Sequence, residues 1–386
     1  MPLRCEMEKR RGNNKIDVAL LVVMTGLIVI GLLMIYSSSA YNAGGDDPQK
    51  FFKAQLRAEV LGAVAMLVVT FIPYKLLRKL GSAPYRYFVL GFALLTVLAL
   101  LTGLGHTAKG ATRWIQIAGM RVQPAEIVKI AVIVYLAGYI SEAPDRINHI
   151  RGYLAGFGVA ALAAGMVYGI SSNLSSAIII GGIAVLMLFV GTKDWFWQIL
   201  IYLGLLAGVI FVVFIIIKNT DDISHLDFRF KRIMIWRHPE AFLLDNGYQT
   251  LQALYAIGSG GFTGKGIGAS VQKLGTIPEV HNDMIFSVIC EEMGLVGAAV
   301  ILILFLLLIY RCLRIALGSH DSFGMLLCVG VMFHIAIQVI LNILVVTNTI
   351  PNTGVSLPFI SYGGSSAVFL MTEMGLVQRV ARESEL

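Results

Sequence analysis

Ten apolar runs, each close to the thickness of a membrane in helical length, constrain this chain more than any other feature. A hydrocarbon core about 30 Å thick is crossed by a helix of roughly 20 apolar residues. Of the 386 residues, 57% are hydrophobic and 14% are charged. The runs lie at 17–37, 58–73, 87–104, 127–140, 153–170, 177–191, 199–217, 284–309, 325–346 and 365–378. The sequence therefore predicts an all-α, polytopic membrane protein with about ten transmembrane helices, forming one domain over 1–386.

The start of the chain joins a basic tail to the first apolar run. Residues 1–15 carry lysine or arginine at five positions, and an apolar stretch follows over 18–36. That stretch is longer than the roughly 7 to 15 residues of a signal-peptide core. We therefore expect a cytoplasmic tail over 1–15 and a first span that is retained.

Basic residues mark one side of the membrane. They recur in alternate connections and at both ends of the chain, so the positive-inside rule places both termini in the cytoplasm. The same distribution explains the formal net charge of +7 without nucleic acid as a partner. The opposite, outer connections also carry basic residues, namely Lys50, Lys53, Arg57, Lys109, Arg113 and Arg121. Cations placed against the rule indicate that the outer face binds an anion.

The longest connection, 218–283, lies on the outer side. Loops beyond about 15 residues are usually functional or disordered. This one carries large apolar residues at helical spacing, from Trp236 to Ile257, which is typical of amphipathic helices at the membrane interface. We expect a large, folded extracytoplasmic loop.

The segment 278–286 ends this loop with an acidic residue, Asp283, just before an apolar run. A carboxylate at the boundary between water and lipid suits a general base, because burial raises a carboxylate's pKa. Asp283 could instead cap the next helix, which is a common role for aspartate. Glu279 is a competing acid. The residue types alone leave these possibilities open.

A second group of residues surrounds the fourth predicted span. Glu126 and Lys129 are three residues apart, so on a helix they share a face and can pair. A charged pair at the outer end of a span indicates a functional site by default, although it could be a structural ion pair. Arg113 next to Trp114 suits phosphate binding, or simple snorkelling to lipid headgroups.

The third group is the segment 351–366, rich in glycine, serine and asparagine and containing Ser361 and Ser365. Irregular backbone at this depth must line a cavity or be packed in protein. Its composition suits backbone N–H donation to phosphate. In the preceding span His334, Gln338 and Asn342 form one polar stripe, which favours hydrogen bonding between helices over catalysis.

These motifs resemble those of the SEDS family of bacterial membrane proteins (shape, elongation, division and sporulation), which includes FtsW, RodA and SpoVE. The resemblance covers nearly the whole chain and is strongest at 110–114, 123–129, 247–249, 256–261, 278–286 and 361–366. The sequences of 281–283 and 352–354 resemble the division and sporulation branch more than the rod-shape branch.

The resemblance implies a peptidoglycan glycosyltransferase that polymerises lipid II at the outer face of the bacterial cytoplasmic membrane, during cell division or sporulation. It implies a class B penicillin-binding protein as transpeptidase partner, together with other division or elongation proteins. It makes Asp283 the essential carboxylate, with Arg113, Glu126 and Lys129 in support. Further substrate-binding or supporting residues are expected at Gln123, Gln249, Ser259, His281, Ser361 and Ser365.

The chain departs from the family pattern after the fifth predicted span. Where the family commonly has Pro-Asp-Leu-Gly-Thr, residues 172–176 read Ser-Asn-Leu-Ser-Ser. Asn173 cannot supply a charge, so we expect it to form hydrogen bonds and not to bind a metal or act in catalysis.

The expected mechanism uses Asp283 to take the proton from an acceptor sugar hydroxyl, with Arg113, Lys129 and a divalent cation, Mg²⁺ or Mn²⁺, stabilising the diphosphate leaving group. No organic cofactor is expected. Two other functions stay open. A lipid II flippase needs polar residues through the full depth of the membrane, whereas these motifs cluster at the outer end. A non-catalytic division scaffold predicts that Asp283 is dispensable.

Overall fold

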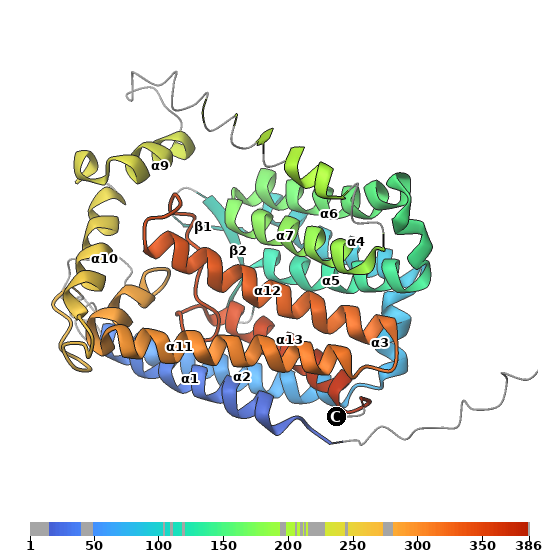
Figure 1. The fold of residues 1–386 in the computed structure, drawn as a ribbon, viewed down its shortest axis with the longest axis horizontal. Helices are drawn as coiled ribbons and strands as arrows, with labels where there is room; N and C mark the ends of the chain where they lie inside the picture. The colour runs from blue at the N-terminus through green and yellow to red at the C-terminus, as the bar shows by residue number, and fades with distance from the viewer. Residues whose placement is uncertain are drawn as a thin grey trace, which may run out of the picture.

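The computed structural model describes residues 15–39, 49–102, 105–108, 111–117, 120–193, 198–204, 207–208, 211, 214, 228–243, 246–272 and 281–384. Glu279, Lys109, the tail up to residue 14 and much of the predicted run 199–217 lie outside these residues. Within them the chain is a bundle of long helices with a smaller group of elements at one end (Figure 1).

The bundle is built from nine long helices among the described residues, and each coincides with one of the predicted apolar runs. They are α1 (Val18–Ser39), α2 (Lys50–Phe71), α4 (Tyr85–Leu98), α5 (Pro124–Glu142), α6 (Ile150–Ser171), α7 (Leu174–Gly191), α11 (Ile285–Leu317), α12 (Ser322–Val346) and α13 (Gly364–Ala381). Eight spans in the described part, all but α13, are long and apolar enough to cross a membrane. The all-α membrane architecture is confirmed, whereas the exact number of spans stays a prediction.

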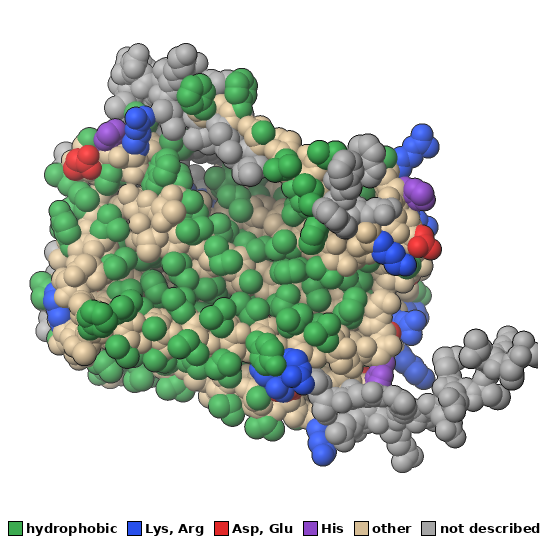
Figure 2. All heavy atoms as spheres, viewed as in Figure 1, with side chains coloured by type: hydrophobic (Ala, Val, Ile, Leu, Met, Phe, Trp, Pro, Cys, Tyr) green, Lys and Arg blue, Asp and Glu red, His purple; other side chains and the backbone are tan. Residues whose placement is uncertain are grey.

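Burial separates central from peripheral helices. The spanning window of α5 is 78% buried and that of α12 is 61% buried, against 28% for α4 and α6. The peripheral helices turn apolar side chains outward, and on the face shown in Figure 2 hydrophobic side chains cover the middle of the molecule. Most charged side chains on that face lie towards its two ends. This distribution matches a bundle surrounded by hydrocarbon and capped by water on both sides.

The two ends of the described chain meet on the same side of the bundle. The backbone N–H of Asp17, just before α1, donates to Oε1 of Gln378 in α13 at 3.0 Å, and Nε2 of Gln378 donates to the Asp17 carbonyl at 2.9 Å. Arg311, near the end of α11, forms an ion pair with the Asp17 carboxylate. The prediction that both termini share a side is confirmed.

The opposite end, called the outer face below, carries elements that are not spans. Three strands form an antiparallel sheet in the order β1 (Gly105–Ala108), β2 (Ala111–Ile117) and β3 (Met120–Val122). The long loop contains α9 (Phe228–Arg237), the short helix η3 (Pro239–Phe242) and α10 (Asn246–Gly260). The expected helices in this loop are confirmed. The sheet was not predicted, because its strands are short and lack an alternating apolar pattern.

Several shorter elements complete the fold. Helix α2 begins at Lys50, so the basic residues Lys53 and Arg57 belong to its first turns and not to a loop. The remaining elements are the amphipathic helix α3 (Tyr74–Gly81) on the cytoplasmic side and the 3₁₀ turns η1 (Ala99–Thr102) and η2 (Pro144–Asn148). Helix α3 and the two 3₁₀ turns were not predicted.

Close backbone contact between α5 and α3 depends on Gly138. A Cβ atom on this glycine would overlap the carbonyl oxygen of Gly81. We expect Gly138→Ala to destabilise the protein by about 1–3 kcal/mol, because the backbones must separate to admit the methyl group. Thermal unfolding in detergent measures this. Gly91→Ala in α4 is the matched control, since nothing lies within 4 Å of its added Cβ; equal melting temperatures for the two variants would contradict the packing argument.

Candidate active site

Asp283 lies on the outer face, in the turn that precedes α11. The residue at the cap position of that helix is Met284, whose side chain makes no cap hydrogen bond. Asp283 thus lies one residue before the cap position, and the choice between helix cap and general base stays a prediction. Its carboxylate lies close to the backbone of the segment before α13, because a Cβ atom on Gly354 would be 3.9 Å from Oδ2 of Asp283.

Asn342, the outermost residue of the predicted polar stripe, fixes the backbone of this turn. Its side-chain amide is fully buried and donates to the carbonyl oxygen of Asp283 at 2.8 Å and to that of Val355 at 2.7 Å. One amide group thus joins the turn at 281–284 to the irregular segment 347–363. Gln338, one turn deeper, donates to the Ser356 carbonyl at 3.1 Å. The predicted bonding between helices holds for His334, which meets Glu373 of α13, whereas Gln338 and Asn342 bond to irregular segments.

Two guanidinium groups, Arg113 and Arg232, lie within electrostatic range of one another, and Arg232 also lies within range of the Asp283 carboxylate. Burial lowers the pKa of Arg232 on α9, and the negative charge of Asp283 opposes that shift. Burial also lowers the pKa of Arg113 on β2, and the positive charge of Arg232 adds to that effect. Partial burial of two like charges is unfavourable. The outer face therefore holds a carboxylate near Arg232 and a second cation, Arg113, near Arg232, and the two cations together favour an anionic ligand.

Arg113 is held by the end of a bundle helix. Its Nε donates to the Ser171 carbonyl at 3.3 Å and its Nη2 donates to the Ser172 carbonyl at 2.9 Å, both at the C-terminus of α6. The carboxyl end of a helix carries partial negative charge, which suits a guanidinium. This anchored position favours a site residue over a side chain that snorkels to lipid headgroups.

Arg232 was not predicted from the sequence, although it carries the same signal as Arg113, a basic residue on the outer side. Its Nη1 donates to the Asn352 carbonyl at 3.2 Å. Helix α9 is further tied to the same segment through Trp236, whose Nε1 donates to the Asn348 carbonyl at 2.9 Å. Sequence spacing could not reveal this, because 120 residues separate Arg232 from Asn352.

The segment 347–363 is packed in protein, as expected of irregular backbone at this depth. Oγ of Ser361 accepts from the Leu357 N–H at 2.7 Å, so this serine shapes the segment itself. The Tyr362 N–H donates to the His281 carbonyl at 2.8 Å, and the His281 ring packs on Phe51 with a centroid distance of 4.2 Å. Ser361 and His281 thus support the fold of the site.

The other predicted supporting residues spread across the outer half. Gln123 occupies the cap position of α5, and Gln249 lies in α10. Ser365 is buried in the first turn of α13. Ser259, at the end of α10, accepts from Nζ of Lys265 at 2.9 Å and belongs to a cluster of its own. Contacts of these four residues with substrate stay predictions.

The predicted pair of Glu126 and Lys129 is confirmed, with 2.8 Å between Oε1 and Nζ. Its further contacts lead into the bundle. Nζ of Lys129 is 3.2 Å from Nε2 of His334 on α12, and Nδ1 of His334 is 2.8 Å from Oε2 of Glu373 on α13. All four side chains are buried. We call them the buried charge chain; it links α5, α12 and α13 and is distinct from the cluster of Asp283 with Arg113 and Arg232.

Asn173 behaves as expected of a neutral side chain. It caps α7, with its side-chain oxygen accepting from the Ser176 N–H at 3.1 Å. The donor set for a protein-held cation does not come together, since among the described residues no three His, Cys, Asp or Glu side chains are grouped to bind a metal. None of the described residues is therefore given the role of holding a cation.

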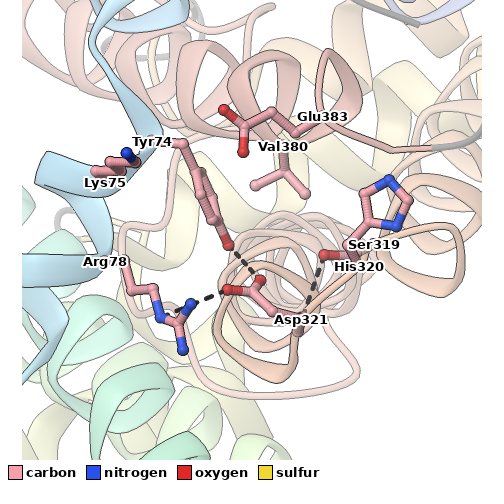
Figure 3. Close-up of a pocket in the computed structure, with 8 residues that line it drawn as sticks. All are labelled: Tyr74, Lys75, Arg78, Ser319, His320, Asp321, Val380 and Glu383. Atoms are coloured by element: carbon pink, nitrogen blue, oxygen red, sulfur yellow. Dashed lines mark hydrogen bonds and ion pairs between the residues drawn. The ribbon is translucent and has the colours of Figure 1, made fainter. Parts of the chain in front are cut away.

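A pocket of about 350 Å³ lies at the other, cytoplasmic end of the bundle (Figure 3). It is lined by Tyr74, Lys75, Arg78, Ser319, His320, Asp321, Val380 and Glu383. The Tyr74 hydroxyl donates to Asp321, whose other oxygen is 3.8 Å from Nε of Arg78. This pocket contains none of the predicted site residues, and its contacts tie α3 to the start of α12.

A helical bundle with a lipid-facing apolar belt defines an integral membrane protein, whose outer face carries the Asp283 carboxylate near Arg232. The family model FTSW_RODA_SPOVE, described as "Cell cycle protein", matches residues 18–386. The chain belongs to this family of bacterial cytoplasmic-membrane proteins, and the resemblance noted in the sequence is confirmed.

Two relatives show the extent of the similarity. The chain is 36% identical over 372 residues to the probable peptidoglycan glycosyltransferase FtsW of Trichlorobacter lovleyi, covering 95% of this chain and 93% of that protein. It is also 36% identical over 372 residues to the stage V sporulation protein E of Bacillus subtilis, covering 95% of this chain and 97% of that protein. The match to both a division and a sporulation protein agrees with the predicted branch of the family.

Solved structures show the same fold. A chain of a peptidoglycan synthase complex matches with a TM-score of 0.76 and 23% identity, over 95% of this chain and 98% of that chain. The rod shape determining protein RodA of Thermus thermophilus matches with a TM-score of 0.66 and 24% identity, over 96% of this chain and 98% of that chain.

The buried charge chain yields a stability prediction. Lys129→Met leaves Glu126 buried without its ion-pair partner, which we expect to cost about 3–5 kcal/mol. The double variant Glu126→Gln/Lys129→Met should recover part of that loss, because the unpaired charge is gone. Equilibrium or thermal unfolding of both single variants and the double variant measures the coupling. Strictly additive losses would show that the two side chains do not act as a pair.

Proposed function

We propose that this protein is a peptidoglycan glycosyltransferase that polymerises lipid II at the outer face of the cytoplasmic membrane, with Asp283 as general base. The observation that carries the assignment of the site is the position of this carboxylate against the Gly354 backbone and near Arg232, with Arg113 within electrostatic range of Arg232. The chemistry is supported by relatives that bear the name peptidoglycan glycosyltransferase and that are similar over 95% of this chain.

In the proposed reaction an acceptor lipid II presents its sugar 4-hydroxyl to Asp283. The carboxylate removes the hydroxyl proton as the oxygen attacks the anomeric carbon of the donor sugar. The bond from that carbon to the diphosphate breaks, and undecaprenyl diphosphate leaves with the bonding electron pair. Attack opposite the leaving group inverts the anomeric centre. A general base contributes about 10²–10⁴-fold when it is held within hydrogen-bond reach of the proton.

Arg113 and Arg232 stabilise the diphosphate as its negative charge develops. Both guanidiniums are partly buried, and burial lowers the pKa of each by disfavouring its charged form. An incoming diphosphate offsets that unfavourable state, and planar guanidiniums match phosphate oxygens with paired hydrogen bonds. Charge stabilisation of this kind is strongest when the donors are already in position, as the contacts to Ser171, Ser172 and Asn352 hold them here.

Lys129 takes a different role from the one expected from the sequence. It is bound to Glu126 and His334 in the buried charge chain, so we assign it to the architecture of the bundle and not to the leaving group. A divalent cation, Mg²⁺ or Mn²⁺, stays a proposal: it would accompany the diphosphate of the substrate and would partly neutralise its charge.

Flippase activity receives less support. The buried charge chain crosses the interior of the bundle, but Lys129, His334 and Glu373 are each 1% exposed and are paired with one another. A transit path for a polar headgroup requires polar groups that a substrate can reach. The described outer-face cluster, in contrast, joins groups with complementary roles in acid–base and anion chemistry.

A transpeptidase of the class B penicillin-binding proteins is the proposed partner, because a polymerase and a crosslinking enzyme act on the same glycan. The fold is similar to a chain of a peptidoglycan synthase complex, which supports an assembly of this kind. Other division or elongation proteins of the membrane are proposed as further partners.

The decisive experiment removes the Asp283 carboxylate. We expect Asp283→Ala and Asp283→Asn to lower polymerisation of labelled lipid II by at least about 10²-fold, since the general base is lost. Purified protein should be assayed with and without its transpeptidase partner. Glu240→Gln is the matched control, because Glu240 is an exposed carboxylate of the same long loop. Polymerisation that persists in Asp283→Ala would falsify the assigned role and favour a scaffold function.

The proposed role of Arg232 is tested by comparing it with a second arginine of the same helix, α9. We expect Arg232→Ala to reduce kcat by about 10²–10³-fold, the range seen when one donor to developing negative charge is removed. Arg237→Ala, an exposed arginine at the end of α9, should stay within about twofold of the wild type, because a surface cation contributes little. Similar rates for the two variants would remove Arg232 from the site.

A further inference from the structure

Helix α11, which follows Asp283 in the chain, is interrupted near its N-terminal end. Gly294 has φ 65° and ψ −166°, which divides the helix into a short half, 285–293, and a long half that spans the membrane. A break of this kind interrupts the backbone hydrogen-bond ladder and leaves carbonyl and N–H groups in need of partners. The short half leads directly to Asp283.

A loop from a distant part of the sequence supplies those partners. We call residues 261–272, which follow α10, the kink loop. Its backbone donates to two freed carbonyls of α11 and accepts from two freed N–H groups. The four bonds are Lys265 N–H to Glu291 O at 2.9 Å, Gly266 N–H to Glu292 O at 3.0 Å, Leu295 N–H to Gly261 O at 3.0 Å and Val296 N–H to Phe262 O at 3.1 Å. The kink loop therefore completes the broken helix on both sides of Gly294.

An ion pair between the buried Glu291 and the partly exposed Lys265 strengthens the same contact. Glu291 is 0% exposed, and its Oε1 is 2.7 Å from Nζ of Lys265. The carboxylate also accepts from the Ser270 hydroxyl and from the Val271 N–H, the latter at 3.2 Å. All these donors belong to the kink loop. Removing the cation leaves the buried Glu291 with an uncompensated charge, so this ion pair holds the loop against α11.

Because Asp283 lies at the end of the short half of α11, a change in the kink angle would move its carboxylate. Eleven residues separate Asp283 from Gly294, which corresponds to about 16 Å along a helix. A tilt of about 4° at the kink would then displace the carboxylate by about 1 Å. A displacement of about 1 Å at a reacting group can lower a rate by about 10²-fold. Small changes in the kink thus have large consequences at the site.

We propose that Lys265 and Glu291 are positioning residues for the glycosyl transfer: through the kink loop they set the angle of the short half of α11 and hence the place of Asp283. This inference rests on the proposed role of Asp283 as general base. It requires neither residue to touch the substrate. It also assigns a purpose to Ser259, which accepts from Lys265 Nζ and so joins α10 to the same ion pair.

Two glycines of the kink loop provide a matched pair of variants. A Cβ atom on Gly264 would overlap the Glu292 carbonyl and crowd the Gly294 N–H, whereas a Cβ atom on Gly268 meets nothing within 4 Å. Both glycines have positive φ, 78° and 87°, so alanine strains the backbone at either position. Only Gly264→Ala also pushes the loop away from the kink.

The measurements are kcat and KM for lipid II together with hydrogen exchange of residues 285–296. We expect Gly264→Ala and Lys265→Ala to lower kcat by about 10–100-fold with KM little changed, and to speed exchange of these amides. Gly268→Ala should stay within about threefold of the wild type, and Lys265→Arg should restore most of the rate because it keeps the charge that pairs with Glu291.

Each outcome separates the positioning role from the proposed function. If Asp283→Ala, assayed in parallel, is inactive while Lys265→Ala and Gly264→Ala match Gly268→Ala in kcat, the positioning role is wrong and the general base stands. If Asp283→Ala remains active, the base assignment itself fails. A rise of KM in step with the loss of rate, or failure of Lys265→Arg to restore it, would overturn positioning in favour of general damage.

Discussion

The side-chain amide of Asn342 joins the two irregular segments that build the outer-face site. A single buried NH₂ group donates to the carbonyls of Asp283 and Val355, which lie before α11 and before α13. In a low-dielectric interior an unpaired backbone carbonyl is costly, so neither segment could take its present path without this donor. The catalytic candidate is therefore held by its backbone from α12.

The need of buried polar groups for partners also explains why the Glu126–Lys129 pair and the two outer-face arginines lie in different places, although the sequence puts both at the outer side. Glu126 and Lys129 enter the bundle, where His334 and Glu373 complete their pairing and where exclusion of water strengthens each contact. The guanidiniums of Arg113 and Arg232 instead stay at the outer face and use backbone carbonyls as anchors. Carbonyl anchors fix the position of a guanidinium without neutralising its charge.

Much of this arrangement follows from the sequence, and the rest does not for identifiable reasons. Apolar run length predicts the spans, and three-residue spacing on a helix predicts the pairing of Glu126 with Lys129, because both depend on local geometry. Arg232 illustrates what local geometry omits, since its place beside Asp283 depends on how α9 folds back over the bundle. The hydrogen bonds between the kink loop and α11 are a second example, because the residues near Gly294 do not indicate that residues 261–266 will complete the hydrogen bonds of the helix.

Charge balance on the outer face connects these features to function. The positive-inside rule disfavours cations on this side, so each one that is retained needs a compensating interaction. Lys265 has one in Glu291, which is buried and belongs to the fold. Arg232 lies within range of the negative charge of Asp283, and Arg113 lies within range of the positive charge of Arg232. A diphosphate would supply negative charge to these two partly buried cations, and the same cations would favour its departure as a leaving group.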